Sequence, residues 1–162
     1  MINIGILTIS DKGSRGQRKD LSGPAIRDMV GGIGVVVDYE IIPDEREQIS
    51  AKLIEWADGG KMDVILTNGG TGLTPRDVTP EATLAVTDKE VPGIAEVMRA
   101  RSLLVTPMAM LSRAVAGLRG QCLIINLPGS PKAVKECLEV VLPAIPHAVQ
   151  MIKGVNTEHS IK

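Results

Sequence analysis

Four short, largely apolar runs constrain the fold of this chain more than any other feature. They are rich in β-branched residues and are bounded by polar or glycine-containing segments, as strands usually are. The runs cover residues 2–9, 35–42, 63–68 and 121–127. Helical segments separate them, and buried strands that alternate with helices form a mostly parallel sheet covered on both faces. The sequence therefore predicts a three-layer α/β/α domain.

The segments between these runs carry the signals of helices. Apolar positions recur at helical spacing, and capping residues or glycines mark the ends. Helices are expected to begin near Ser22, Asp44, Thr79 and Ser130. The stretch 92–117 is expected to form two helices broken at Thr106-Pro107, because the residue before a proline avoids the helical region.

The length of 162 residues fits one domain of ordinary size. We expect a single domain over residues 1–154 and a flexible C-terminal tail over residues 155–162. The chain has no Phe, so its core must consist of aliphatic side chains and methionines. Two cysteines with no metal-ligand spacing, Cys122 and Cys137, are interpreted as buried thiols. Three methionines are assigned to helix packing: Met98, Met108 and Met110.

The charge balance argues against two classes of partner. With 18 basic and 19 acidic residues the net charge is -1, and one Trp and one Tyr offer no stacking platform, so nucleic acid is not expected as a ligand. No apolar run approaches the roughly 18 residues of a membrane span. The chain opens without a basic leader, so a cytoplasmic protein is expected.

Four polar loops follow the four predicted strands. In open parallel sheets ligands bind outside the carboxyl ends of the strands, so these loops are expected to gather at one edge. Together they carry Asp11, Asp44, Asp77, Ser130 and the glycine turn at 69–72. The sequence thus predicts one cleft built from segments that lie far apart along the chain.

The glycine turn and two of the aspartates suggest a phosphate and metal site. Successive backbone N–H groups of an open turn can face an anion, and Mg²⁺ takes one or two carboxylates plus substrate phosphates. The turn matches neither a Walker A loop nor G-x-G-x-x-G, and a tight strand-to-helix turn is the structural alternative. Asp44 also fits a helix N-cap, and Asp77 a residue that favours a helix start. The combination favours phosphoryl or nucleotidyl transfer without a protein nucleophile.

The remaining histidines and cations divide into candidates for phosphate binding and residues without an expected role in the site. Ser-His-Asp chemistry is not expected, because His147 falls in a late helix and His159 in the tail. Cations next to the loops are candidates for phosphate binding: Arg76, Arg113 and Lys132. Cations assigned to solvated helix faces are Lys52, Arg99 and Lys135.

With these residues in view, the chain resembles the molybdopterin adenylyltransferase family of molybdenum-cofactor biosynthesis over nearly its whole length. The resemblance rests on six motifs in family order: "TISD" 8–11, "IPDE" 42–45, "TNGGTG" 67–72, "RDVTPEAT" 76–83, "LSRAVAG" 111–117 and "INLPGSPKA" 125–133. It implies an enzyme that uses ATP and Mg²⁺ to transfer AMP onto the terminal phosphate of molybdopterin and releases pyrophosphate. It also implies a homotrimer, with the molybdate-insertion enzyme as a candidate partner.

The resemblance carries functional residues over to matching positions. Asp44 and Asp77 fall on the two essential aspartates, which makes them the candidate catalytic residues and metal ligands. Thr71 and Ser102 match positions associated with pterin and phosphate binding. Further candidate contacts to nucleotide or pterin are Ser10, Asp11, Gly70, Gly72, Arg113, Pro128, Gly129 and Ser130.

Several alternative functions compete with the adenylyltransferase interpretation. A non-catalytic molybdopterin carrier would bind the pterin without consuming ATP. The related insertion enzyme has a similar domain but usually further domains, and a scaffold role is known for a fused animal relative. A dinucleotide-binding domain is disfavoured, because the expected glycine spacing is missing.

Overall fold

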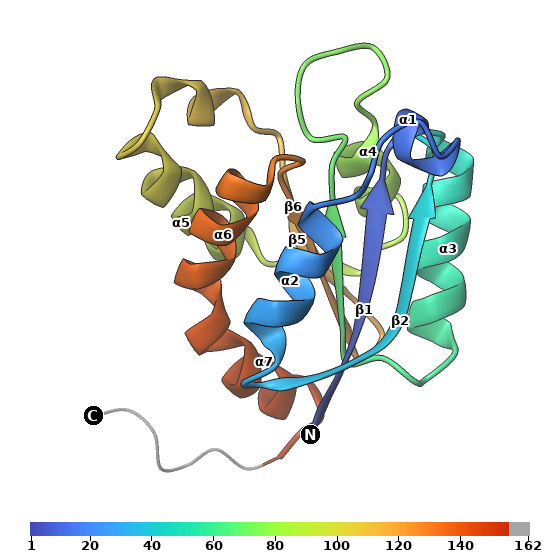
Figure 1. Cartoon of the computed structure of the whole chain (residues 1–162). Coiled ribbons are helices and arrows are strands. Elements are labelled where there is room, and N and C mark those ends of the chain that lie inside the picture. The colour runs from blue at the N-terminus through green and yellow to red at the C-terminus, as the bar shows by residue number, and fades with distance from the viewer. Residues whose placement is uncertain (156–162) are drawn as a thin grey trace.

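The computed structural model describes residues 1–155, which fold around one six-stranded sheet in the order β2-β1-β3-β6-β5-β4 (Figure 1). The strands are β1 Ile2–Ile9, β2 Gly34–Ile42, β3 Val64–Asn68, β4 Lys89–Glu90, β5 Ala116–Arg119 and β6 Cys122–Leu127. β2, β1, β3 and β6 are mutually parallel, while β5 runs antiparallel to β6 and to β4. The predicted mostly parallel α/β sheet is confirmed. Of the predicted tail, residues 156–162 lie outside the described part.

Helices cover both faces of the sheet (Figure 1). One face carries α2 Ser22–Val30, α5 Pro92–Leu103, α6 Pro131–Val141 and α7 Ile145–Ile152, and the other carries α3 Arg46–Asp58 and α4 Thr79–Leu84. A single turn, α1 Asp11–Ser14, follows β1, and two 3-10 segments are η1 Pro107–Leu111 and η2 Leu142–Ala144. α6 shows why these helices pack: Val134, Cys137, Leu138 and Val141 share one buried face. Within residues 1–155 no helix is long and apolar enough to span a membrane.

The two faces of the sheet have separate hydrophobic cores. Side chains alternate along each strand, so Ile4 and Ile6 pack beneath α2, α5 and α6, whereas Leu7 and Ile9 pack against α3. Met98 is buried as expected, but Met108 and Met110 are 63% and 64% exposed, so their assignment to helix packing was wrong. Both cysteines are buried thiols, as expected, and burial raises the pKa of Cys122 to about 12.

The stretch 92–117 departs from the expected pair of helices. α5 ends at Leu103, the hydroxyl of Thr106 accepts a hydrogen bond from the N–H of Met108, and only the 3-10 segment η1 follows. The chain then becomes extended and pairs as β5. Gly117 allows the close antiparallel approach of β4 to β5, because a Cβ there would lie 2.7 Å from the backbone oxygen of Lys89 in β4.

At the amino end of the parallel strands, two aspartates have partners for both carboxylate oxygens. Asp63 accepts a hydrogen bond from the N–H of Asn3 at 2.8 Å and forms an ion pair with Lys153 at 2.7 Å. Asp58 accepts two hydrogen bonds from Arg119, at 3.0 and 2.9 Å. The long loops lie at the opposite, carboxyl end.

Candidate active site

The loops that follow β1, β3 and β6 meet at the carboxyl end of the sheet, as predicted. The N–H of Gly69 donates a hydrogen bond to the backbone oxygen of Leu127 at 3.1 Å. A Cβ on Gly129 would lie 3.5 Å from the Cα of Gly69. Segments almost sixty residues apart in the sequence are therefore in backbone contact at this edge.

The glycine turn requires glycine for two independent reasons. Gly69 and Gly70 have φ values of +100° and +68°, a region that side chains disfavour. A Cβ on Gly70 would also lie 2.2 Å from the hydroxyl oxygen of Thr79. That hydroxyl donates to the backbone oxygen of Gly69 at 3.0 Å. Thr79 therefore fixes the turn, and it is the first residue of α4 rather than its expected N-cap.

The turn presents three consecutive backbone N–H groups without protein partners. Gly70, Thr71 and Gly72 follow β3 directly, and within residues 1–155 their N–H groups donate to no protein acceptor. Such a run of free donors in an open turn is typical of an anion-binding backbone.

Asp44 and Asp77 lie against the two ends of this turn. A Cβ on Gly70 would be 3.1 Å from Oδ1 of Asp44, and one on Gly72 would be 2.9 Å from Oδ2 of Asp77. Oδ2 of Asp44 accepts from the N–H of Asp11 at 2.9 Å, and Oδ2 of Asp77 accepts from the N–H and hydroxyl of Thr74 at 3.0 and 2.8 Å. Within the described part of the chain, no protein donor reaches Oδ1 of either aspartate.

The environment of Asp44 disfavours its charged form. Burial, and secondarily the charges of Asp11 and Asp77, hold the pKa of Asp44 above its ordinary value, although hydrogen bonding with Asp11 and the charge of Arg76 oppose this. Asp44 was also a candidate N-cap, and that interpretation was wrong. The cap position of α3 is Glu45, because the Asp44 carboxylate is turned toward the loop after β1.

Arg76, a candidate phosphate ligand, is engaged with acidic side chains. Its guanidinium donates to both carboxylate oxygens of Asp11 at 3.0 Å and to Glu45 at 2.8 Å. The hydrogen bond from Arg76 lowers the pKa of Asp11 despite an opposing effect of burial. Asp11 and Asp44 are tied as well, since the N–H of Asp44 donates to Oδ1 of Asp11 at 3.0 Å. The two loops that carry these acids are therefore linked.

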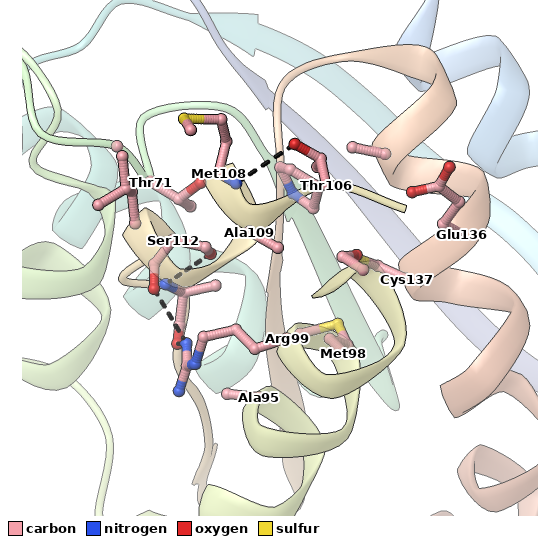
Figure 2. A pocket seen from close by; sticks show the side chains of 16 residues that line it. Thr71, Ala95, Met98, Arg99, Thr106, Met108, Ala109, Ser112, Glu136 and Cys137 are labelled. Atoms are coloured by element: carbon pink, nitrogen blue, oxygen red, sulfur yellow. Dashed lines mark hydrogen bonds between the residues drawn. The ribbon is translucent and has the colours of Figure 1, made fainter. Parts of the chain in front are cut away.

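A first cavity, here called the apolar cavity, has a volume of about 290 Å³ and lies between the glycine turn, α5, η1 and α6 (Figure 2). Thr71, Gly72, Ser102 and Pro128 are predicted site residues that line it. The thiol of Cys137 is 3.4 Å from the hydroxyl oxygen of Ser102.

Arg99 also lines the apolar cavity, although the sequence assigned it to a solvated helix face, and this assignment was wrong. Its guanidinium donates to the backbone oxygens of Ser112 and Ala114 at 3.3 and 2.9 Å (Figure 2). A signal was present in the sequence: Arg99 falls on the same face of α5 as Ala95 and Ser102, at spacings of four and three.

A second cavity, here called the charged cavity, has a volume of about 230 Å³. Its lining includes Ser10, Arg18, Lys19, Asp20 and Gly129. Ser10 and Gly129 were predicted site residues, whereas the run from Arg18 to Asp20 was overlooked because it looked like an ordinary loop. Ser10 also caps α1 by accepting from the N–H of Gly13 at 2.9 Å.

Asp20 anchors one wall of the charged cavity. It accepts hydrogen bonds from the hydroxyls of Thr8 and Tyr39 and from the N–H groups of Ser22 and Gly23. Burial alone would raise the pKa of Asp20, but these hydrogen bonds outweigh it and bring the pKa below its ordinary value.

One thin wall separates the two cavities. Thr71, Gly72 and Pro128 face the apolar cavity, while Gly69 and Gly129 face the charged cavity. The wall therefore consists of the glycine turn and the loop after β6.

Four predicted contacts lie outside both cavity linings, and so do Asp44 and Asp77; the four are Asp11, Gly70, Arg113 and Ser130. Ser130 accepts from the N–H of Ala133 at 3.2 Å and caps α6. The guanidinium of Arg113 donates hydrogen bonds to the backbone oxygens of Gly72 and Asp77 and to the Glu81 carboxylate. Within residues 1–155 no three His, Cys, Asp or Glu side chains gather as a ready metal site. Two carboxylates are enough for Mg²⁺ where phosphates complete the shell.

The chain matches known proteins over most of its length. Residues 5–147 match the family model described as "Probable molybdopterin binding domain". The chain is 48% identical to the molybdopterin adenylyltransferase of Helicobacter pylori strain J99, covering 94% of this chain and 89% of that protein. It is 41% identical to the molybdopterin adenylyltransferase of Escherichia coli K12, with 97% and 88% covered.

Solved structures agree with these matches. The crystal structure of the molybdopterin biosynthesis enzyme MoaB from Thermus thermophilus is 56% identical in sequence and superimposes with a TM-score of 0.89, covering 95% of this chain and 98% of that one. The resemblance predicted from six motifs is confirmed. The chain belongs to the molybdopterin-binding family of molybdenum-cofactor biosynthesis that includes the molybdopterin adenylyltransferases.

Proposed function

We propose that this protein transfers AMP from ATP to the terminal phosphate of molybdopterin and releases pyrophosphate. One observation carries the proposal: Asp44 and Asp77 flank a glycine turn that forms the wall between two cavities. Two cavities suit a reaction of two substrates, and a turn with free N–H groups between them suits the phosphates that react. The names of the relatives support the same activity.

The residues present fit a Mg²⁺ ion. Asp44 and Asp77 lie beside the same turn, and each has an Oδ1 atom that accepts no hydrogen bond within residues 1–155. Mg²⁺ is usually held by one or two carboxylates together with phosphate oxygens. Bound there, Mg²⁺ would neutralise charge on the transferring phosphoryl group. Burial raises the pKa of Asp44, and a cation bound there would favour the charged form of this carboxylate.

The remaining chemistry is positioning by the chain itself. The free N–H groups of Gly70, Thr71 and Gly72 bind phosphate oxygens and hold the α-phosphorus of ATP beside the terminal phosphate of molybdopterin. An oxygen of the terminal phosphate of molybdopterin bonds to the α-phosphorus. The bond between the α-phosphorus and the oxygen that bridges it to the β-phosphate breaks. Pyrophosphate leaves with that electron pair, and no protein nucleophile takes part.

Purified protein with ATP, MgCl₂ and molybdopterin tests the proposal. We expect adenylylated molybdopterin and pyrophosphate in equal amounts, and loss of both when EDTA removes the metal. A carrier would instead bind molybdopterin without consuming ATP. Unchanged turnover in Asp44→Asn and Asp77→Asn would refute the assigned roles even if wild-type protein catalyses the reaction.

We further propose a homotrimer that acts in the cytoplasm. The end of α5 and η1 expose a group of large apolar side chains that includes Leu103, Leu104, Met108 and Met110, with Leu104 82% exposed. Burial of this group between subunits would remove it from water. Light scattering after gel filtration should give three times the chain mass, and Leu104→Asp should lower that mass. A monomeric wild type would refute the assembly without touching the proposed chemistry.

A further inference from the structure

Arg113 bridges the two ends of the loop that carries Asp77. The residue lies between η1 and β5, and its guanidinium reaches the loop after β3 and the start of α4. Nε donates to the backbone oxygen of Gly72 at 2.8 Å, and one terminal nitrogen donates to the backbone oxygen of Asp77 at 2.7 Å. The other terminal nitrogen bonds to the carboxylate of Glu81. All three guanidinium nitrogens are therefore engaged with protein acceptors.

The backbone reinforces this bridge. The N–H of Arg113 donates to the backbone oxygen of Thr71 at 2.9 Å, so the glycine turn is held both by side chain and by main chain. Inside the loop, the N–H of Asp77 donates to the backbone oxygen of Thr74, whose own N–H and hydroxyl donate to the Asp77 carboxylate. The loop is thus closed at both ends and cross-linked in the middle.

The segment around Arg113 is itself held from the far side. Arg99 of α5 donates to the backbone oxygens of Ser112 and Ala114, the two neighbours of Arg113 (Figure 2). A planar guanidinium that makes several directed hydrogen bonds has a defined position, which a lysine ammonium cannot reproduce. The position of Asp77 therefore depends on a rigid chain from α5 through Arg113 to the loop.

We propose that Arg113 is a positioning residue that fixes Asp77 and the glycine turn relative to each other, rather than a ligand of a substrate phosphate. The role in catalysis rests on the proposed function, whereas the role in holding the loop does not. Glu81, in the first turn of α4, keeps the guanidinium in place. Placement of a metal-binding carboxylate by such outer contacts commonly changes metal affinity about 10- to 100-fold.

A first experiment measures the loop without any substrate. Amide hydrogen exchange of peptides that cover residues 71–78 is compared in wild type, Arg113→Lys and a matched control, Arg119→Lys. Arg119 makes the same kinds of bond, to the Asp58 carboxylate and to the backbone oxygen of Val86, but at the amino end of the sheet. Arg113→Lys should speed exchange of the two hydrogen-bonded amides in these peptides, those of Thr74 and Asp77, by about 5- to 30-fold, as expected for the loss of one or two hydrogen bonds. Arg119→Lys should leave the loop unchanged.

A second experiment separates positioning from substrate binding. In Arg113→Lys we expect kcat to fall about 10- to 100-fold and the Mg²⁺ concentration for half-maximal rate to rise by a similar factor. The KM for ATP and the dissociation constant for molybdopterin should stay within about twofold of wild type. A phosphate ligand predicts the reverse: weaker substrate binding and an unchanged loop.

The outcomes decide between these roles. Unchanged exchange in residues 71–78 overturns the proposal, whether or not the protein is an adenylyltransferase. Faster exchange in an Arg113→Lys variant of a protein that makes no adenylylated product supports the loop contact and rejects the proposed function. If Arg113→Lys does not fold, Glu81→Gln takes its place. It should give a smaller increase in exchange in the same peptides, and no increase overturns the proposal.

Discussion

The two ends of the parallel strands differ in whether their aspartates have hydrogen-bond partners for both carboxylate oxygens. At the amino end, Asp63 is bonded to the N–H of Asn3 and to Lys153, and the pKa of Asp63 lies below its ordinary value because these partners outweigh burial. At the carboxyl end, burial raises the pKa of Asp44. The Oδ1 atom of Asp44 and that of Asp77 each accept no hydrogen bond within residues 1–155.

This difference supports a ligand site at the carboxyl end of the strands. A partly buried polar group without a partner costs free energy, so folding alone favours the arrangement of the amino end. At the carboxyl end, carboxylate oxygens and N–H groups without protein partners within residues 1–155 are available to a metal and phosphates. Substitution of Asp44 or Asp77 should therefore reduce activity more than stability, whereas substitution of a bonded pair at the amino end should leave activity unchanged.

The largest expected effect on activity is that of Asp77→Asn. The variant keeps an oxygen for the hydrogen bonds from Thr74 but removes a negative charge, so we expect turnover to fall at least about a hundredfold with little change in the melting temperature. Asp58→Asn, the control at the amino end, should leave turnover within about twofold. Steady-state pyrophosphate release measures both. Equal effects on turnover at the two ends would remove the distinction between them.

Gly70→Ala should affect activity and stability together. Gly70 has a φ of +68°, and the added Cβ would lie 2.2 Å from the hydroxyl oxygen of Thr79, so we expect a loss of about 3 kcal/mol in the free energy of unfolding. We also expect at least a tenfold loss of turnover, because displacement of the turn by about 1 Å would misplace the reacting groups. At the amino end Gly120 has a φ of +55°, and a Cβ added there would meet no atom within 4 Å. Gly120→Ala should therefore cost only about 1 kcal/mol. Urea unfolding of both variants gives the difference.

Asp20→Asn tests a fully bonded carboxylate at the carboxyl end. Its hydrogen bonds predict a loss of about 2 kcal/mol in the free energy of unfolding at neutral pH. The pKa of Asp20 is lower in the folded than in the unfolded protein, so the stabilising contribution is complete above the ordinary value of about 3.9. It is lost as the pH falls through the folded pKa. Urea titrations at pH 7 and near pH 3 should show the gap between variant and wild type closing in acid; a constant gap would contradict this account.

The smallest effect is expected for Lys153→Gln at the amino end. The lysine side chain is 45% exposed, and exposed ion pairs contribute at most about 1 kcal/mol. The difference from wild type should shrink further in 1 M NaCl, where charges are screened over about 3 Å. Turnover should not change, and a marked loss of turnover would show that the two ends are coupled.

Much of this architecture was predictable from the sequence. The apolar runs identified all four parallel strands, and the rule that loops gather at the carboxyl ends brought Asp44, Asp77 and the glycine turn together before any coordinates. Both steps depend on local pattern and topology, which a sequence carries directly. β5 was missed because Ala116 and Gly117 lack strand-like side chains, and tertiary contacts determine their conformation.

The partners of long side chains were harder to predict. Arg99 and Arg113 were sorted by their position along helices and loops, but their hydrogen bonds depend on carbonyl oxygens that only folding brings near. Met108 and Met110 follow a helical spacing, yet η1 is a single 3-10 segment at the surface. Asp44 fitted the sequence rule for an N-cap, but its carboxylate bonds to the backbone of another loop.

The thin wall between the apolar and charged cavities has a practical consequence for inhibitor design. Two weak fragments, one in each cavity, would lie on either side of the backbone of residues 69–72 and 128–129. A short tether over that wall would join them, and the local concentration of the second fragment would then reach the millimolar range without any new contact. Such a two-headed compound should gain affinity mainly by dissociating more slowly.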